Sequence, residues 1–234
     1  MDWWQSFKDS FYLNFIQDDR WRFLTDGLAV TLQVTALAVI VGVVLGFLVA
    51  LVRTIHEETG RFKILNAIAG AYLTFFRGTP VVVQLMLIYF VVLGQWLSVT
   101  NKILAAVLAF GINSGAYQAE IFRAGIQSVP RGQFEAGRCL GFNYRQTMIT
   151  IIMPQALKNI LPTLCNEFIT LLKETSVAGY IALQDLTKGG DIIRSRTYSA
   201  FLPLIAVALI YLVMVLVLTR LIRLLERRLK RSER

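Results

Sequence analysis

Residues 27–52 read GLAVTLQVTALAVIVGVVLGFLVALV, and this stretch decides the class of fold. It carries no charged side chain, and most of its residues are apolar. A helix needs about 20 such residues to cross the hydrocarbon core of a bilayer. The stretch is therefore long enough to span a membrane, and we predict a first transmembrane helix over about residues 24–52.

The rest of the chain continues this pattern, since 56% of its 234 residues are hydrophobic, which is more than soluble domains usually contain. The chain is predicted to be an all-α integral membrane protein with five transmembrane helices in the lipid bilayer. The polar stretches 53–63 and 182–199 are expected to be exposed loops. The four further spans are predicted over about residues 64–97, 103–122, 160–181 and 200–218.

The segment 64–97 is too long for one straight span. It is interrupted by the sequence RGTP at residues 77–80, where Pro80 cannot donate a backbone hydrogen bond. We therefore expect a lead-in helix over residues 64–76, near the cytoplasmic face, and a main span over residues 80–97.

Two pairs of glycines have the spacing that lets helices approach closely. Gly42 and Gly46 lie in the first predicted span, and Gly111 and Gly115 lie in the third. The second half of the third span is polar, so one of its faces must avoid lipid. Close packing of this span against a neighbouring helix is expected.

Lys and Arg set the orientation, because cytoplasmic loops are rich in them. More of these charges lie on the side that holds residues 53–63, residues 123–158 and the basic tail 223–234. We therefore expect an N-terminus outside and a cytoplasmic C-terminus. Residues 1–23 mix Trp, Phe and Tyr with Asp, which favours an interfacial segment at the headgroup region.

Residues 131–162, RGQFEAGRCLGFNYRQTMITIIMPQALKNILP, form a long polar and basic island between apolar segments. Residues 133–140 favour a helix, and Gly141 can take a turn conformation. Asn143 can cap a second helix from about Tyr144. We expect two short helices joined at Gly141.

The same island is predicted to be a cytoplasmic docking loop. An ordinary solvated loop is the alternative, but such a loop rarely keeps many apolar residues unless they rest on a partner or a membrane. Ala136 and Gly137 are small enough to let another protein approach the backbone, and Glu135 offers a carboxylate. The apolar residues are Phe134, Leu140, Phe142, Tyr144, Met148, Ile149, Ile151 and Ile152.

The chain carries no sequence pattern for its own chemistry. It has no Gly-rich phosphate loop ending in Gly-Lys-Ser/Thr, so we do not expect it to hydrolyse ATP. Two cysteines and one histidine are too few for a metal site or a disulfide framework. The one histidine, His56, lies in a predicted short cytoplasmic loop that is remote from any plausible nucleophile, so no catalytic triad is expected. The net charge of +9 does not come with a soluble basic and aromatic stretch, so no nucleic-acid partner is expected.

Ionisable residues within the predicted spans need partners or a purpose, because a charge in hydrocarbon costs a few kcal/mol. Arg77 and Lys173 balance Glu167 and Glu174, which suits either internal ion pairing or recognition of a zwitterion. Arg77 can hold a carboxylate with two hydrogen bonds, and Glu167 or Glu174 would then meet an ammonium group. Lys173 can instead extend to the membrane surface or neutralise Glu174.

The fourth predicted span carries a polar stripe that should face the protein interior, since its members recur at helical spacing. From depth and spacing we predict that part of this stripe lines a passage site together with residues of the second and third spans. The stripe contains Asn166, Glu167, Thr170, Lys173 and Glu174. The predicted passage site contains Arg77, Asn113, Glu167, Thr170 and Glu174.

Several segments, taken in order, resemble the permease subunits of polar amino acid ABC importers, with the type I importer fold. Residues 76–80 (FRGTP) and 114–120 (SGAYQAE) are similar to two segments of that family. Residues 135–154 resemble its EAA loop, and residues 166–176 resemble its fourth span. The likeness runs from the first span to the tail.

The resemblance implies a permease domain over residues 24–222 in the inner (cytoplasmic) membrane of a bacterium. It implies a second permease copy or a sister subunit, two cytoplasmic ATPases that bind ATP and Mg, and an extracytoplasmic solute-binding protein. Gly137 stands where a second Ala is usual, and Met153 where Leu is usual. The residues that would couple to the ATPase are Glu135, Ala136, Gly137, Gly141, Met153 and Pro154.

The alternative is a self-contained secondary transporter or channel for small polar solutes. Such proteins often contain paired inverted halves, and five spans without an internal repeat do not match that plan. Glutamine, glutamate and basic amino acids all fit the balanced set of charges, and the partner permease can be identical or different.

Overall fold

The computed structural model describes residues 3–231, with side chains up to Arg227, and every regular element in this range is a helix. Two short irregular turns, residues 12–19, join α1 to α2. The main helices are α1 (Trp3–Phe11), α2 (Trp21–Thr59), α3 (Lys63–Gly78), α4 (Val81–Met86), α5 (Lys102–Gln127), α6 (Arg131–Cys139), α7 (Tyr144–Thr147), α8 (Met153–Glu174), α9 (Leu186–Thr197) and α10 (Phe201–Arg231).

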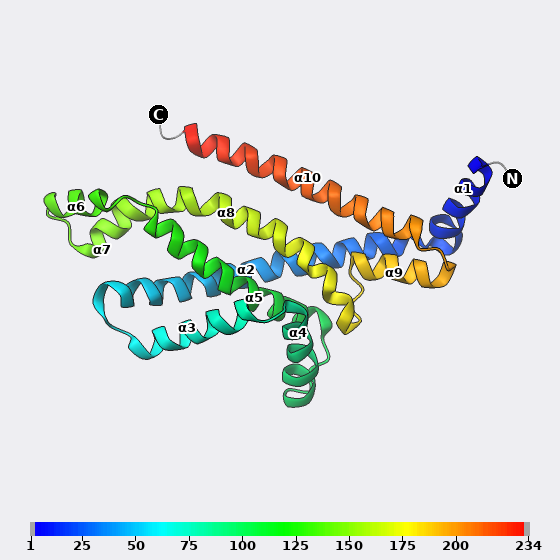
Figure 1. The fold of residues 1–234 in the computed structure, drawn as a ribbon, viewed down its shortest axis with the longest axis horizontal. Coiled ribbons are helices and arrows are strands. Elements are labelled where there is room, and N and C mark those ends of the chain that lie inside the picture. The colour runs from blue at the N-terminus through cyan, green and yellow to red at the C-terminus, as the bar shows by residue number, and fades with distance from the viewer. Residues whose placement is uncertain (1–2, 232–234) are drawn as a thin grey trace.

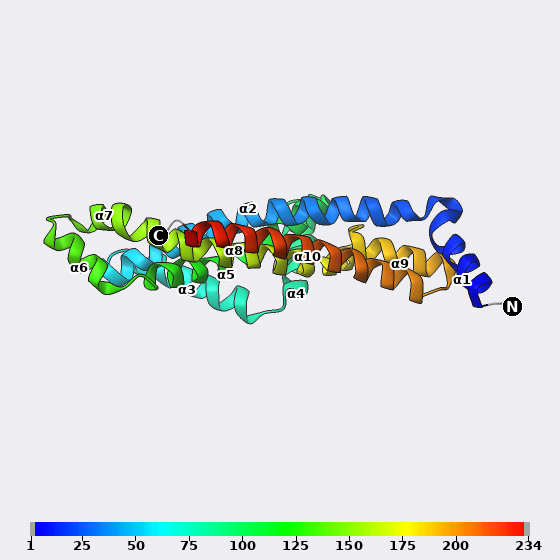
Figure 2. The ribbon, with the colours of Figure 1, turned by 90° about the horizontal axis from the view of Figure 1, so that it is seen from above.

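The molecule is elongated, and its two ends are built from different elements (Figures 1 and 2). Helices α1 and α9 lie at one end, and α6 and α7 lie at the other. Helix α10 runs from the first end back toward the second, so the described ends of the chain lie far apart along the long axis. This arrangement fits a chain that crosses a membrane an odd number of times.

Helix α5 is the centre of the bundle and packs against α2, α3, α4 and α8. Its first half is buried through Ala105, Ala106 and Phe110. The two predicted glycine pairs bring α2 and α5 together: a Cβ atom on Gly46 would lie 2.9 Å from the carbonyl oxygen of Gly115. The expected close packing of this span is confirmed.

Three helical stretches are long and apolar enough to cross a membrane, namely 21–59, 144–181 and 201–227. Helix α3 and the helix from Val81 to Trp96 pass the same test together, and they are bent by 110° at the break between them. This bend confirms the predicted interruption at residues 77–80. Helix α5 is not in this set, because its second half is polar, and the count of five spans stays a prediction.

Several helices continue past the ends of the apolar stretches that were predicted as spans. Helix α2 runs to Thr59, through most of the predicted loop 53–63, and stops at Gly60, whose φ of 67° is left-handed. Helical structure is continuous from Tyr144 to Ile181, so it passes without a break through residues 160–162, where the fourth span is predicted to begin. Helix α10 likewise extends beyond the predicted end at residue 218. Glu, Lys and Arg are good helix formers, so a loss of hydropathy does not end a helix.

The predicted outer loop 182–199 is wrong, since it is largely helix α9. Asp185 caps this helix by accepting hydrogen bonds of 3.1 Å from the backbone N–H groups of Thr187 and Lys188. Leu186 and Ile193 are fully buried against α2 and α10. The segment contains many charged residues, so the helical spacing of its few apolar residues was not recognised in the sequence.

Helix α1 exposes several large aromatic side chains, as an interfacial segment would, although its position relative to a membrane stays a prediction. Trp3 and Trp4 are 77% and 56% exposed. The predicted tail 223–234 is the helical end of α10 as far as Arg231, and residues 1–2 and 232–234 lie outside the described range.

Candidate functional site

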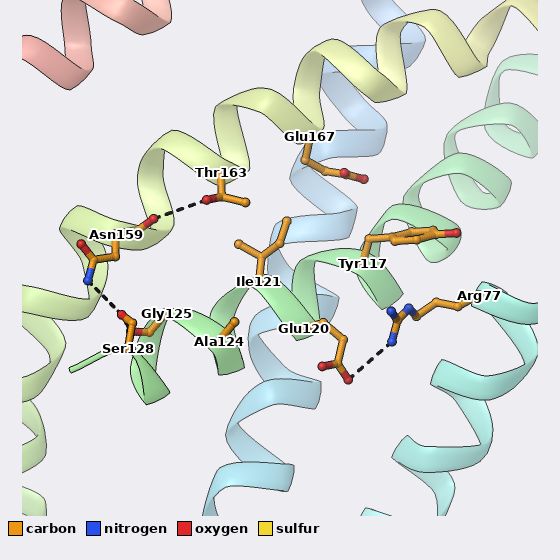
Figure 3. A pocket seen from close by; sticks show the side chains of 10 residues that line it. All are labelled: Arg77, Tyr117, Glu120, Ile121, Ala124, Gly125, Ser128, Asn159, Thr163 and Glu167. Atoms are coloured by element: carbon orange, nitrogen blue, oxygen red, sulfur yellow. Dashed lines mark hydrogen bonds and ion pairs between the residues drawn. The ribbon is translucent and has the colours of Figure 1, made fainter. Parts of the chain in front are cut away.

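A cavity of about 500 Å³ lies between the end of α3, the polar half of α5 and one face of α8 (Figure 3). Its walls combine one cation, two carboxylates, small polar groups and a tyrosine ring. The lining residues are Arg77, Tyr117, Glu120, Ile121, Ala124, Gly125, Ser128, Asn159, Thr163 and Glu167.

Arg77 is the cation of this cavity, and it sits in the last turn of α3, where the helix dipole favours positive charge. Its Nη1 atom lies 3.7 Å from Oε1 of Glu120, and its guanidinium lies 5.7 Å from the centre of the Tyr117 ring. The Arg77 side chain is 44% exposed, so the guanidinium is still accessible to an anion. Two hydrogen bonds from one guanidinium suit a carboxylate.

Glu167 faces the cavity from α8 and is half-buried. The hydroxyl of Ser114 on α5 donates a hydrogen bond of 3.1 Å to its Oε1 atom. No side chain in the described part of the chain forms an ion pair with Glu167. Its carboxylate is therefore available to a positively charged group.

Three of the five residues predicted for the passage site do not line this cavity. Arg77 and Glu167 do, but Asn113 is buried beneath the break between α3 and α4. Its amide nitrogen donates to the Phe76 carbonyl at 3.0 Å and to Oε1 of Gln84 at 2.9 Å. Gln84 in turn donates to the Phe76 carbonyl, also at 3.0 Å. Asn113 thus holds the bend by pairing a carbonyl that the broken helix leaves free.

Within this chain, the polar stripe on α8 faces the cavity only through Glu167, so the predicted interior orientation is not found for its other members. Asn166, Thr170 and Lys173 are exposed, and Glu174 is half-buried away from the cavity. The interior positions of the same turns are taken by apolar residues that fill the core, such as Leu171 and Leu172. Apart from Glu167, the members of the stripe do not line the cavity.

Five polar residues of the cavity were not predicted, namely Tyr117, Glu120, Ser128, Asn159 and Thr163, and helical spacing relates most of them to one another. Asn159, Thr163 and Glu167 follow one another at intervals of four, so they share one face of α8. Tyr117 and Glu120 are three residues apart on α5. Their nearness to Arg77 depends on the bend between α3 and α4.

A helical hairpin at the far end of the molecule matches the predicted pair of short helices. Helix α6 ends before Gly141, whose φ of 80° is left-handed and suits glycine. Asn143 and Gln146 then form a reciprocal capping box, with two hydrogen bonds of 2.9 Å at the start of α7. The predicted turn and cap are confirmed.

The outer surface of this hairpin is partly apolar. Leu140 is 70% exposed and Ile149 is 58% exposed, and Glu135 and Ala136 lie exposed on α6. Pro154 is exposed near the start of α8. An apolar surface of this kind is expected where another protein binds.

Gly137 has a different role from the one predicted, because it is buried inside the hairpin. A Cβ atom at this position would lie 2.6 Å from Cγ2 of Thr147 and 3.2 Å from Cδ1 of Ile151. The glycine therefore lets α6 pack against α7 and the turn that follows it. Ala136, its exposed neighbour, is the small residue that an incoming protein can reach. Met153 is half-buried.

Comparison with known proteins identifies a family and several relatives. The family described as "Binding-protein-dependent transport system inner membrane component" matches residues 42–231. The arginine transport system permease protein ArtQ of Bacillus subtilis is 40% identical over 212 residues, covering 90% of this chain and 94% of the relative. A putative glutamine transport system permease protein GlnP of Rickettsia bellii is 38% identical, covering 88% and 93%.

Solved structures show the same architecture. A chain of a crystal structure titled as an amino acid ABC transporter with histidines matches with a TM-score of 0.82 and 45% identity, covering 88% of this chain and 94% of the other. A chain of the inward-facing MetNI methionine ABC transporter matches with a TM-score of 0.71 at 22% identity, which speaks for the fold alone.

Proposed function

This chain belongs to the family of inner-membrane components of binding-protein-dependent transport systems, and from that premise we propose that it is the permease subunit of an ABC importer for a polar amino acid. It forms the pathway by which the amino acid crosses the membrane. The named relatives support this role over a self-contained secondary transporter or channel.

One observation carries the proposal, namely a cavity that offers complementary groups to a free amino acid. Arg77 can hold the α-carboxylate, and Glu167 can receive the α-ammonium group. Glu120 adds a second carboxylate to the lining, and it is paired with both Arg77 and Arg123, so these four charged groups are neutral together. Similarity to the relative named as an arginine transport permease favours a substrate with a positively charged side chain.

The proposed membrane placement combines the two different ends of the molecule with the distribution of Lys and Arg. We assign one span each to α2, the bent pair α3–α4, α5, the long helix through α8, and α10. The hairpin end then faces the cytoplasm, and the end with α1 and α9 faces outward. Five crossings agree with the wide separation of the two chain ends (Figure 1).

Partners complete the importer. Two cytoplasmic ATPases, which carry ATP and Mg, dock on the hairpin surface around Glu135, Ala136 and Leu140. A second permease, identical or different, covers the polar stripe of α8, because Lys173 and Glu174 would otherwise face lipid at a cost of a few kcal/mol each. The extracytoplasmic binding protein delivers the amino acid at the α1 and α9 end.

Purification from the native membrane tests the assembly. An ATPase in fixed stoichiometry with the permease is expected to remain bound, and uptake into vesicles should require ATP. Active uptake by this chain alone in ATP-free vesicles would overturn the assignment. A competition panel of basic, neutral and acidic amino acids then identifies the substrate, and we expect L-arginine or L-lysine to compete best.

Site variants separate the cavity from the stripe. Arg77→Ala and Glu167→Gln should each weaken amino acid binding by about 1.5–3 kcal/mol, the usual range for a hydrogen bond to a charged group. Thr170→Ala and Glu174→Gln, on α8 but outside the cavity lining, serve as controls and should change binding much less. The reverse order would move the binding site from the cavity to the stripe.

A further inference from the structure

Four charged side chains of alternating sign link the cavity to the cytoplasmic end of α2. Glu120 lies 3.7 Å from Arg77 and 3.0 Å from Nη2 of Arg123. Arg123 lies 3.4 Å from Oε1 of Glu57, near the end of α2. Gln127, one turn further along α5, donates to the other oxygen of Glu57 at 3.5 Å. The groups on α5 share one face of that helix, since they follow at intervals of three and four.

This row of ion pairs ends beside the hairpin of α6 and α7, which we call the docking hairpin. Glu57 and Gln127 form part of the wall of a second cavity, of about 680 Å³, between the ends of α2 and α5 and the hairpin. From α6, the facing wall of this cavity contributes Arg131, Phe134, Glu135 and Arg138. Glu57 therefore faces α6 across this cavity.

Glu120 is shared between two cations, so a change at one of its ion pairs can affect the other. Its Oε1 atom faces Arg77 and its Oε2 atom faces Arg123. A carboxylate bound at Arg77 would compete with Glu120 for that guanidinium. Glu120 would then interact more strongly with Arg123, and Arg123 would interact less with Glu57.

We propose that Arg123 and Glu57 are positioning residues that transmit occupancy of the cavity at Arg77 to the docking hairpin. This inference rests on the proposed function, because it requires an amino acid carboxylate at Arg77. Binding of that carboxylate loosens the Arg123–Glu57 pair and releases the end of α2 from its position beside α6.

The test uses the complete importer in lipid nanodiscs, with a fluorescent bimane group on the exposed Cys139 at the end of α6. Cys165→Ser and cysteine-free partners keep the label at one site. Binding of L-arginine or L-glutamine is measured by calorimetry, and bimane emission is recorded in the same samples without ATP. The ratio of amino-acid-stimulated to basal ATP hydrolysis is the second readout.

Glu57→Gln is the diagnostic variant, and Glu58→Gln is its matched control. Glu58 lines the same cavity but forms no ion pair among the described residues. In the parent and in Glu58→Gln, the amino acid should shift the bimane emission. In Glu57→Gln, binding should persist, the shift should vanish, and the stimulation ratio should fall by about two- to thirty-fold. Glu57→Asp should restore part of the response.

The outcomes separate this inference from the proposed function. If neither amino acid binds the parent complex, both fail. If an amino acid binds but the emission shifts in no variant, or shifts equally in Glu57→Gln and Glu58→Gln, only the transmission through Glu57 is overturned.

Discussion

A methyl group added at Gly46 tests how closely α2 and α5 must approach. In the structure, a Cβ atom at this position would lie 2.8 Å from Cβ of Gln118, 2.9 Å from the backbone nitrogen of Ala119 and 2.9 Å from the carbonyl oxygen of Gly115. Two of these three atoms are backbone atoms of α5, which cannot move aside as a flexible side chain would. The helices must separate to admit the methyl group.

Two opposing effects set the size of the change. Replacing glycine by alanine inside a helix stabilises it by about 1 kcal/mol. Overpacking a well-packed contact costs about 1–3 kcal/mol. Gly46→Ala should therefore lower the free energy of unfolding by up to about 2 kcal/mol.

Gly70→Ala on α3 isolates the steric part of this effect. A Cβ atom there meets nothing within 4 Å, so only the gain in helix propensity remains. The free energies of unfolding of the purified chain should be measured by titration with a denaturing detergent. The two variants should differ by about 1–3 kcal/mol, the overpacking cost, with Gly70→Ala the more stable. Equal stability of the two variants would refute the close approach of α2 and α5.

Three further predictions concern the hairpin, the bend and α1. Gly141→Val, which forces a branched side chain to a φ of 80°, should strain the hairpin by about 1–3 kcal/mol and uncouple ATP hydrolysis from uptake without preventing membrane insertion; normal coupled uptake would argue against a docking role. Asn113→Leu should reduce the free energy of unfolding by about 1–3 kcal/mol, because Oε1 of Gln84 loses its donor; an unchanged value would mean that this amide does not hold the bend. Trp3 and Trp4 fluorescence, in a variant whose other tryptophans are Phe, should be quenched by lipids brominated near the headgroup; no quenching would place α1 away from the bilayer.

Local signals in the sequence were enough for the elements that depend on them. A charge-free run predicts α2, and Pro80 predicts the break that appears as a bend of 110°. Gly141 and Asn143 predict the turn and cap of the hairpin, because left-handed geometry and capping are properties of single residues. Each of these features is decided within a few residues of chain.

Features that depend on packing between distant segments were not predictable. The charges of α9 suggested an exposed loop, yet burial of Leu186 and Ile193 makes it a packed helix. Arg77 and Glu167 stood out as charges in apolar surroundings, but the pairing of Arg77 with Glu120 depends on the direction in which α3 bends. Asn113 is polar within an apolar region, and only the structure shows that it pairs with the broken backbone.

The polar stripe of α8 is another feature whose surroundings cannot be predicted from sequence. A period of 3.6 residues establishes that one face of a helix is polar, but not what covers that face. In the single chain Asn166, Thr170 and Lys173 of the stripe are exposed, and Lys173 and Glu174 would be costly in lipid. A stripe that faces a second permease and a stripe that lines a passage have the same sequence pattern, namely polar side chains at helical spacing. They differ in which variants weaken amino acid binding and which weaken assembly, so Glu174→Gln should loosen the permease pair while Glu167→Gln should weaken binding.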